Sequence, residues 1–200
     1  MTQVIDYFFG IGSPWAYIGF DAFLEVAARH KATVQPHLIP LIEENGAIYS
    51  RNRPEARRAY WLRDLRRWAS LRNKPLALDN RAGLSDPTSA GRLVVAAQID
   101  GLDWIALTRA LQTALWGRAD NIGAPDVRAA IVSKAGFDAQ RLEARAGDAD
   151  IQAVLDANFL RAKQAGVFGI PTFRYEDELY WGQDSLPFLE RHLAGERLVA

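Results

Sequence analysis

The spacing of apolar positions divides the chain into three stretches of different character. Near the N-terminus, Val4 to Phe9 is a short apolar run rich in β-branched and aromatic residues, which predicts a buried strand. Apolar residues then recur at helical spacing from Tyr17 to Ala27, which predicts a helix ending near Arg29. Thr33 to Ile39 has strand composition again, and its proline favours an edge position because proline cannot donate to a ladder. This order indicates a β-α-β unit.

The middle of the chain, residues 42–165, shows helical spacing only. An amphipathic helix is predicted over Glu55–Arg72, and a turn-rich stretch follows from Asp79 to Pro87. The apolar face expected for that helix consists of Ala59, Leu62, Leu65, Trp68 and Ala69. Further helices are predicted over about residues 88–99, 103–116, 125–135, 138–145 and 149–165, with Asp103 and Asp138 as N-caps.

Strand composition returns after Gly166. Two short strands, Pro171–Tyr175 and Leu179–Trp181, are separated by a turn, which is a hairpin signal. A last helix is predicted from Asp184 or Ser185, one of which is expected to cap it, to about Leu193. The two ends of the chain thus supply β-α-β and β-β-α. We therefore expect an α/β fold: a thioredoxin-like domain from residues 1–41 and 166–200, with an all-helical insertion domain at 42–165.

Composition narrows the possible partners. The 200 residues carry 24 basic and 24 acidic side chains, which argues against a nucleic-acid partner. No apolar run reaches the roughly 18–20 residues of a membrane span, and the N-terminus has no signal-peptide pattern. The chain contains no cysteine, so it cannot form or exchange a disulfide of its own. We expect a cytoplasmic protein, and any thiol chemistry must use a thiol brought by a cofactor.

Ser13 is the first candidate for chemistry. With Pro14 after it, Ser13 fits an N-cap, and that role alone would explain both residues. A hydroxyl at a helix N-terminus can also donate to an anion such as a bound thiolate, and the two roles are compatible. The histidines show no partner pattern that would indicate a base, and surface or packed positions are expected for His30, His37 and His192.

Three further segments are candidates for binding. Ile170-Pro171 lies in a glycine-bounded loop; if its peptide bond is cis, the backbone of Ile170 could pair with an extended peptide-like ligand. Gln183 and Asp184 precede a predicted helix and could hold an amino-acid head group. The chain is dense in arginine over residues 51–72, and from Arg63 onward these residues are expected to form a solvated helix face. The arginines are Arg51, Arg53, Arg57, Arg58, Arg63, Arg66, Arg67 and Arg72. Arg53 and Arg57 are better placed to meet a ligand carboxylate.

With these pieces in order, the chain resembles the 2-hydroxychromene-2-carboxylate isomerases. That family is similar to the kappa class of glutathione transferases, within the thioredoxin-like superfamily that includes DsbA. The resemblance runs nearly end to end. It rests on the order and spacing of Tyr7-Phe8-Phe9 with Ser13 to Tyr17, Asn52-Arg53-Pro54, Tyr60 to Leu65, Trp116 to Ile122, Gly166 to Phe173 and Trp181 to Asp184.

The resemblance implies glutathione as the cofactor. It implies that Ser13 hydrogen-bonds the glutathione sulfur and that Ile170, before a cis Pro171, pairs with the cysteinyl backbone. Gln183 and Asp184 are implied to bind the γ-glutamyl end, and Asn52 with Arg53 and Arg57 to complete the pocket. In the family reaction a thiolate adds to the ring-opened chromene carboxylate, the former double bond rotates, and the thiolate leaves to give trans-o-hydroxybenzylidenepyruvate. Family members are often dimers, so a homodimer acting on a small aromatic ketoacid is expected.

Two alternatives stay open at the level of sequence. A kappa-like transferase would conjugate glutathione to electrophiles and consume it. A non-catalytic module on the same scaffold would bind glutathione or a peptide without turnover. A disulfide oxidoreductase is excluded, because no residue of this chain can form the mixed disulfide.

Overall fold

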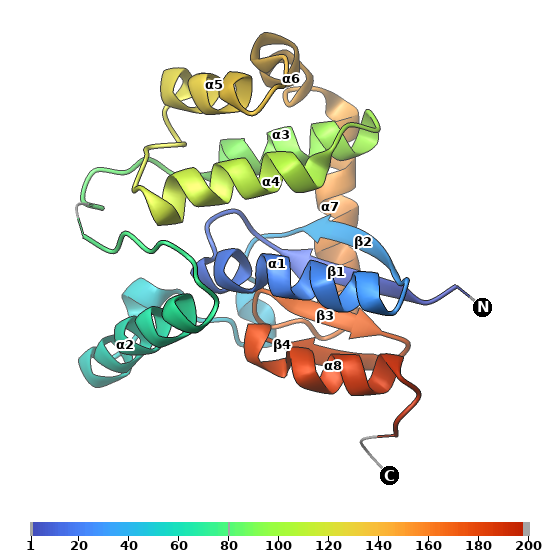
Figure 1. Cartoon of the computed structure of the whole chain (residues 1–200). Helices are drawn as coiled ribbons and strands as arrows, with labels where there is room; N and C mark the ends of the chain where they lie inside the picture. The colour runs from blue at the N-terminus through green and yellow to red at the C-terminus, as the bar shows by residue number, and fades with distance from the viewer. Residues whose placement is uncertain (1, 80, 198–200) are drawn as a thin grey trace.

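The structure is a computed structural model that describes residues 2–79 and 81–197, and within them four strands form one mixed sheet (Figure 1). The strands are β1 (Val4–Phe9), β2 (Thr33–Leu38), β3 (Thr172–Tyr175) and β4 (Glu178–Trp181), in the order β2-β1-β3-β4. β1 runs parallel to β2 and antiparallel to β3, and β3 is antiparallel to β4. The predicted strand containing Pro36 does lie at an edge.

Helices cover both faces of this sheet. On the face toward the viewer in Figure 1 lie α1 (Pro14–Arg29) and α8 (Leu186–Leu193), and α7 (Ala149–Gln164) passes behind. The alternation of β1 explains this arrangement. Tyr7 and Phe9 stack 4.5 Å apart between ring centroids on the α1 side, whereas Phe8 packs on the other face near α7. The predicted α/β fold, with helices inserted between a β-α-β half and a β-β-α half, is confirmed.

The remaining helices follow the predicted order. They are α2 (Glu55–Leu71), α3 (Thr88–Ile99), α4 (Trp104–Gln112), α5 (Pro125–Lys134) and α6 (Ala139–Arg145). Short 3-10 turns occupy Glu43–Asn45, Ser50–Asn52 and Gln183–Ser185. Asp103 and Asp138 cap their helices as predicted, accepting from the N–H groups of Ala106 and Arg141. The division of the chain into two domains stays a prediction.

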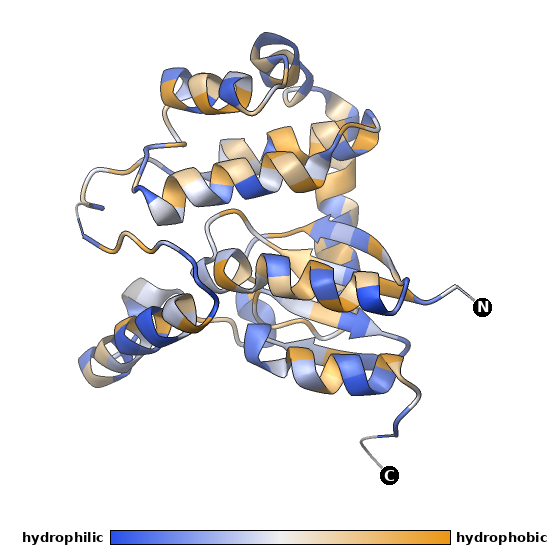
Figure 2. Cartoon of the chain, in the orientation of Figure 1, coloured by the Kyte–Doolittle hydropathy of each residue, from blue (hydrophilic) through white to orange (hydrophobic). Residues whose placement is uncertain are grey.

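Three details differ from the pattern-based expectation. The helix predicted over 103–116 is α-helical only to Gln112 and ends in a π-helical turn, Thr113–Gly117. On α2, only Leu65 and Ala69 are buried, and Ala59 is exposed; much of this helix is hydrophilic (Figure 2). Neither Asp184 nor Ser185 caps α8 with its side chain, because the hydroxyl of Ser185 donates instead to the carbonyl of Gly182 at 2.7 Å.

None of the helices in the described ranges has the length and apolar composition needed to cross a bilayer.

Candidate functional site

Ser13 is held at the N-terminus of α1 by the turn that follows β1. Its N–H donates to the carbonyl of Gly10 at 3.1 Å, and its Oγ accepts from the N–H of Ala16 at 3.2 Å. Pro14 occupies the first turn, where its missing N–H costs nothing. The residue is therefore the N-cap that the sequence predicts. The same hydroxyl also faces a segment 157 residues away, because Oγ donates to the carbonyl of Ile170 at 3.2 Å.

The Ile170–Pro171 peptide bond is cis, which is the conformation that the resemblance implied. The carbonyl of Ile170 accepts the hydroxyl of Ser13, so the loop and the start of α1 are in direct contact. In the described part of the chain, the N–H of Ile170 donates to no acceptor. The structure thus brings Ser13, Ile170 and Pro171 together, with one backbone donor left free.

Gly169 allows the loop to pack against β4. A Cβ at this position would collide with the indole of Trp181, which lies against the glycine and contacts the ring of Phe168 at 4.9 Å between centroids. The hydroxyl of Thr172 donates to the carbonyl of Gly169 at 2.7 Å and fixes the other side. Any larger residue here would displace the backbone that presents Ile170.

Gln183 lies behind the site rather than on its surface. Its side chain is fully buried and packs against Gly19 of α1, where a Cβ would collide with it. Its Oε1 accepts from Nε of Arg72 at 3.3 Å, and its Nε2 has no partner. Asp184 next to it is exposed. The geometry therefore leaves Asp184 accessible to a ligand, whereas the amide of Gln183 anchors the segment to α1.

The residues predicted to complete the pocket lie in and just after the 3-10 turn before α2 and in the first turn of α2, which packs beside α1. Asn52 and Arg57 are exposed. The guanidinium of Arg53 is half-buried and lies 5.6 Å from the ring centroid of Trp61. Burial, helped by the nearby charge of Arg57, lowers the pKa of Arg53. No hydrogen bond among the described residues joins these three side chains to Ser13 or Ile170.

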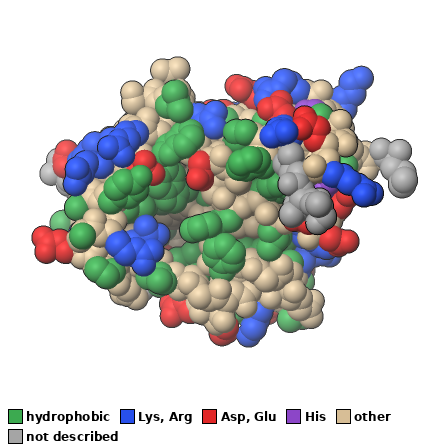
Figure 3. Space-filling model, turned by 90° about the horizontal axis from the view of Figure 1, so that it is seen from below, with side chains coloured by type: hydrophobic (Ala, Val, Ile, Leu, Met, Phe, Trp, Pro, Cys, Tyr) green, Lys and Arg blue, Asp and Glu red, His purple; other side chains and the backbone are tan. Residues whose placement is uncertain are grey.

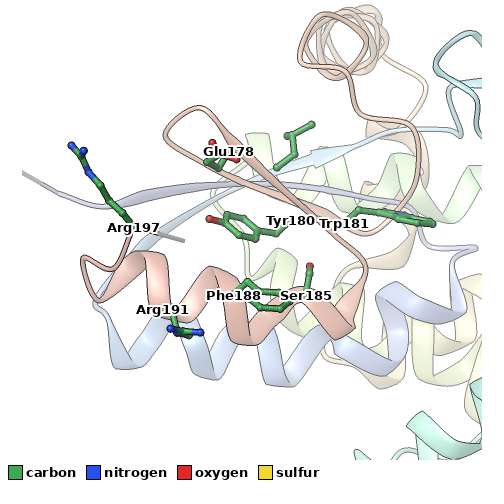
Figure 4. A pocket seen from close by; sticks show the side chains of 8 residues that line it. Glu178, Tyr180, Trp181, Ser185, Phe188, Arg191 and Arg197 are labelled. Carbon is green, nitrogen blue, oxygen red and sulfur yellow. The ribbon is translucent and has the colours of Figure 1, made fainter. Parts of the chain in front are cut away.

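Seen from below, the surface has a hollow bordered by hydrophobic side chains, with basic side chains beside it (Figure 3). It lies on the side of the molecule where α2 stands in Figure 1. A second, open pocket of about 520 Å³ lies between the outer edge of β4 and α8 (Figure 4). Tyr180 and Phe188 line this pocket, and the ring of Trp181 points away toward the loop of Ile170.

The histidines are packed or near the surface, but one takes part in a polar network that the sequence pattern did not show. Nε2 of His37 lies 2.7 Å from Asp6 Oδ1, and its Nδ1 lies 3.0 Å from Asn158 Oδ1. Burial opposes ionisation of Asp6, but the hydrogen bond and charge of His37, with Arg161 and Arg174, outweigh it and lower the pKa of Asp6. Asp6 alternates with Tyr7 and so faces α7, away from Ser13.

No group of acidic, histidine or cysteine side chains able to hold a metal ion occurs in residues 2–79 and 81–197. The described geometry offers a capped serine hydroxyl, a cis-proline loop with a free N–H, and an exposed carboxylate. In a chain without cysteine, these groups form a candidate site on a fold of the thioredoxin class.

The family described as DSBA-like thioredoxin domain matches residues 4–194, and the chain belongs to it. Within this family the chain is similar to the 2-hydroxychromene-2-carboxylate isomerase of Sphingobium xenophagum, with 27% identity over 96% of this chain and 99% of that protein. The isomerase of Pseudomonas putida is 24% identical over 94% of this chain and 93% of its own length. These matches confirm the resemblance predicted from the motifs.

Solved structures agree on the fold. A 2-hydroxychromene-2-carboxylate isomerase structure superposes with a TM-score of 0.80, at 24% identity over 96% of this chain and 95% of that one. The cytosolic disulfide reductase DsbM from Pseudomonas aeruginosa, solved with GSH, superposes with a TM-score of 0.63, at 23% identity over 96% of this chain and 99% of that one.

Proposed function

We propose that the protein is a glutathione-dependent cis-trans isomerase that converts 2-hydroxychromene-2-carboxylate, or a close aromatic analogue, to trans-o-hydroxybenzylidenepyruvate. The observation that carries this proposal is the direct contact between Ser13 and Ile170 at the N-terminus of α1, in a chain with no cysteine. The near full-length similarity to proteins named as isomerases of this substrate supports it.

The residues present fit glutathione. The free N–H of Ile170 and its carbonyl can pair with the cysteinyl backbone of a tripeptide. Asp184 is exposed and can hold the ammonium of the γ-glutamyl end, with Gln183 keeping the segment in place. Asn52, Arg53 and Arg57 are proposed to face the remaining carboxylate, although only Arg53 is partly buried.

The hydroxyl of Ser13 can donate to the glutathione sulfur once the ligand backbone pairs with Ile170. At present it donates to the carbonyl of Ile170. A ligand N–H that takes over this carbonyl releases the hydroxyl proton for another acceptor. Ser13 Oγ still accepts from Ala16, so the hydroxyl keeps its place while it turns toward the sulfur. Ligand pairing at Ile170 and thiolate stabilisation by Ser13 are thus coupled.

Glutathione, when bound, supplies the thiolate that adds to the conjugated system and leaves after bond rotation. The protein favours the charged form of that sulfur with the Ser13 hydroxyl and the N-terminus of α1. Together these are expected to lower the thiol pKa by about one to two units from the reference of about 8.5. The remaining rate acceleration is expected from holding the sulfur and the acceptor carbon in attack geometry.

The test is Ser13→Ala. We expect turnover of 2-hydroxychromene-2-carboxylate to fall on the order of 10–100-fold, the scale of one charge-assisted hydrogen bond. The matched control is Ser133→Ala, which alters an exposed serine on α5 and is expected to leave the rate unchanged. An unchanged rate in Ser13→Ala, with glutathione still bound, would remove Ser13 from the reaction.

The fate of glutathione separates the alternatives. Isomerisation with glutathione recovered in full supports the proposal. Stoichiometric formation of a conjugate would instead identify a kappa-like transferase. Binding without turnover of either kind would identify a non-catalytic module on this scaffold.

We also propose that the protein is a cytoplasmic homodimer. Exposed aromatic rings at the edge of the sheet support a dimer, because Trp181 is 53% and Phe188 54% exposed, and Phe168 is 38% exposed. Sedimentation equilibrium measures the oligomeric state directly, and a monomer at all concentrations would refute this part.

A further inference from the structure

Arg81 lies in the turn-rich segment between α2 and α3, and only one end of its guanidinium is bound. Its Nη1 donates to the carbonyl of Leu115 at 2.7 Å and to that of Ala77 at 3.3 Å. Its Cζ lies 3.8 Å from the ring centroid of Trp116, so the indole covers the guanidinium. Among the described residues, the Nε–H and Nη2–H edge has no hydrogen-bond partner and no ion pair.

Arg128 on α5 shows what this arrangement looks like when it is complete. Its Nη1 also donates to two carbonyls, those of Ile122 and Gly123, both at 3.1 Å. Its Nε and Nη2 bind the two carboxylate oxygens of Glu143 at 2.6 and 2.8 Å. This two-pronged contact is the geometry in which arginine binds a carboxylate best. Arg81 has the same carbonyl contacts, but the carboxylate is missing.

Two buried polar side chains in the segment that ends at Trp116 also lack hydrogen-bond partners among the described residues. The indole N–H of Trp116 is buried without a partner. One helical turn earlier, Gln112 is fully buried and neither atom of its amide has a partner. Burial lowers the pKa of Arg81, and no described carboxylate opposes this effect. Because buried polar groups in proteins are almost always paired, the unpaired indole N–H beside the guanidinium indicates a place for a further polar group.

The segment that carries Arg81 is held at its ends close to the start of α1. The segment that carries Arg81 is fixed at one end by the N–H of Ala77, which donates to the carbonyl of Trp116 at 2.7 Å. At its other end, Pro87 lies so close to Gly12 that a Cβ there would be 3.2 Å away. Gly117 is equally close to the hydroxyl of Tyr17, one turn or about 6 Å along α1 from Ser13. Arg81 is thus carried by a segment that spans the N-terminus of α1.

We propose that Arg81 binds the carboxylate of the aromatic ketoacid through Nε–H and Nη2–H, with Trp116 stacked beneath the guanidinium. The assignment rests on the proposed function for the identity of the acid. It adds a carboxylate contact to those predicted for Arg53 and Arg57, which are proposed above to face a carboxylate of glutathione. In the described structure, Arg57 is exposed and no hydrogen bond fixes Arg53, whereas two carbonyls fix Arg81.

The test compares an acid with its neutral ester. The probes are trans-o-hydroxybenzylidenepyruvate and its methyl ester, and their affinities are measured by quenching of tryptophan fluorescence and by calorimetry. Wild type is expected to bind the acid at least about 10-fold more tightly than the ester. Arg81→Gln is expected to lose about 10–100-fold in affinity for the acid and little for the ester. Arg81→Lys, which keeps the charge but not the two-pronged geometry, should fall between them.

Arg118→Gln is the matched control. It removes the same charge two residues from Trp116, but Arg118 is exposed and already binds Asp120 at 2.8 Å. We expect it to keep the wild-type preference for the acid. Equal affinity of wild type for acid and ester, or acid binding unchanged in Arg81→Gln, would overturn the assignment. An equal loss of acid and ester would mean that Arg81 only holds its loop.

A separate readout keeps this proposal distinct from the proposed function. The ultraviolet absorbance of bound glutathione thiolate, recorded without any aromatic acid, is expected to persist in Arg81→Gln and to fall in Ser13→Ala. If no thiolate forms in wild type while the acid preference depends on Arg81, the proposed function fails and the carboxylate site stands. If the thiolate forms but the acid preference is absent, only the carboxylate site fails.

Discussion

Arg81 and Arg128 make the same contacts with backbone carbonyls, but only Arg128 is also bound by a carboxylate. In each, Nη1 is fixed by two backbone carbonyls, which sets the direction of the remaining donors. Arg128 directs its Nε and Nη2 at Glu143. Arg81 has no described carboxylate and lies against an aromatic ring instead. The difference indicates that one guanidinium serves the fold, whereas the other is available to a ligand.

The different burial of the two guanidinium groups explains why only Arg128 needs a carboxylate within the protein. The Arg128 side chain is only 5% exposed, so its charge needs a partner at all times. Arg81 is half-buried, and an indole beside it compensates part of the lost hydration. A cation in that position is tolerated without a counter-ion, and it gains most when a ligand carboxylate arrives. We therefore expect mutation at the Arg128 pair to reduce stability and mutation at Arg81 to reduce ligand affinity.

The largest expected effect is on the complete pair. Glu143→Gln leaves the Arg128 charge without its carboxylate, and we expect a loss of about 2–4 kcal/mol in the free energy of unfolding, measured in urea. Affinity for the aromatic acid should not change in the folded fraction. The exposed Glu178 gives the control, since Glu178→Gln removes the same charge where there is no buried partner. A loss below about 0.5 kcal/mol in Glu143→Gln would show that the pair stabilises the fold no more than an ordinary surface contact does.

The second prediction concerns a carboxylate introduced near Arg81. Gln112→Glu places a buried carboxylate one helical turn before Trp116, and we expect its negative charge to weaken the binding of an acid at Arg81. We expect at least a 10-fold loss in affinity for the acid, about 1.4 kcal/mol, and a smaller loss for the methyl ester. Gln112→Met keeps the volume without the charge and should retain the preference for the acid. Unchanged acid binding in Gln112→Glu would place this residue outside the carboxylate site.

The smallest expected effect is on the pH dependence of stability, through the hydrogen-bonded pair of Asp6 and His37. The pKa of Asp6 in the folded state lies below the unfolded value of 3.8, so its stabilisation is present above that pH and is lost as the pH falls through the folded pKa. We expect the stability gap between wild type and Asp6→Asn to be constant near neutral pH and to shrink below about pH 4. Thermal unfolding across this range measures it, and a gap that widened in acid would contradict the direction of the shift.

Much of the fold could be predicted because its elements have strong local signals. β1 alternates between two buried faces, α1 has a cap and a proline at its first turn, and α8 places leucines on one side. The apolar face of α2 was assigned too widely, because Ala59 follows the helical period but is exposed to solvent. The π-helical turn after Gln112 has no pattern that distinguishes it from a regular helix.

The candidate site divides in the same way. Ser13 could be identified because its position before Pro14 is a local signal. The burial of Gln183 could not, because it depends on Gly19, which lies far away in the sequence and leaves room for it. Arg81 left no signal in the sequence either, since a single arginine in a turn-rich stretch looks like any other surface charge.

By itself, the sequence determined which elements form, where α1 is capped, and that any reactive sulfur must come from outside the chain. These properties depend on neighbouring residues or on composition. Only the tertiary structure decided which charges are paired. The carbonyl of Leu115 that fixes Arg81 is 34 residues away, and the carboxylate that completes Arg128 is 15 residues away. Because such contacts form only when separate segments pack together, no pattern along the chain could show which arginine keeps its donors free.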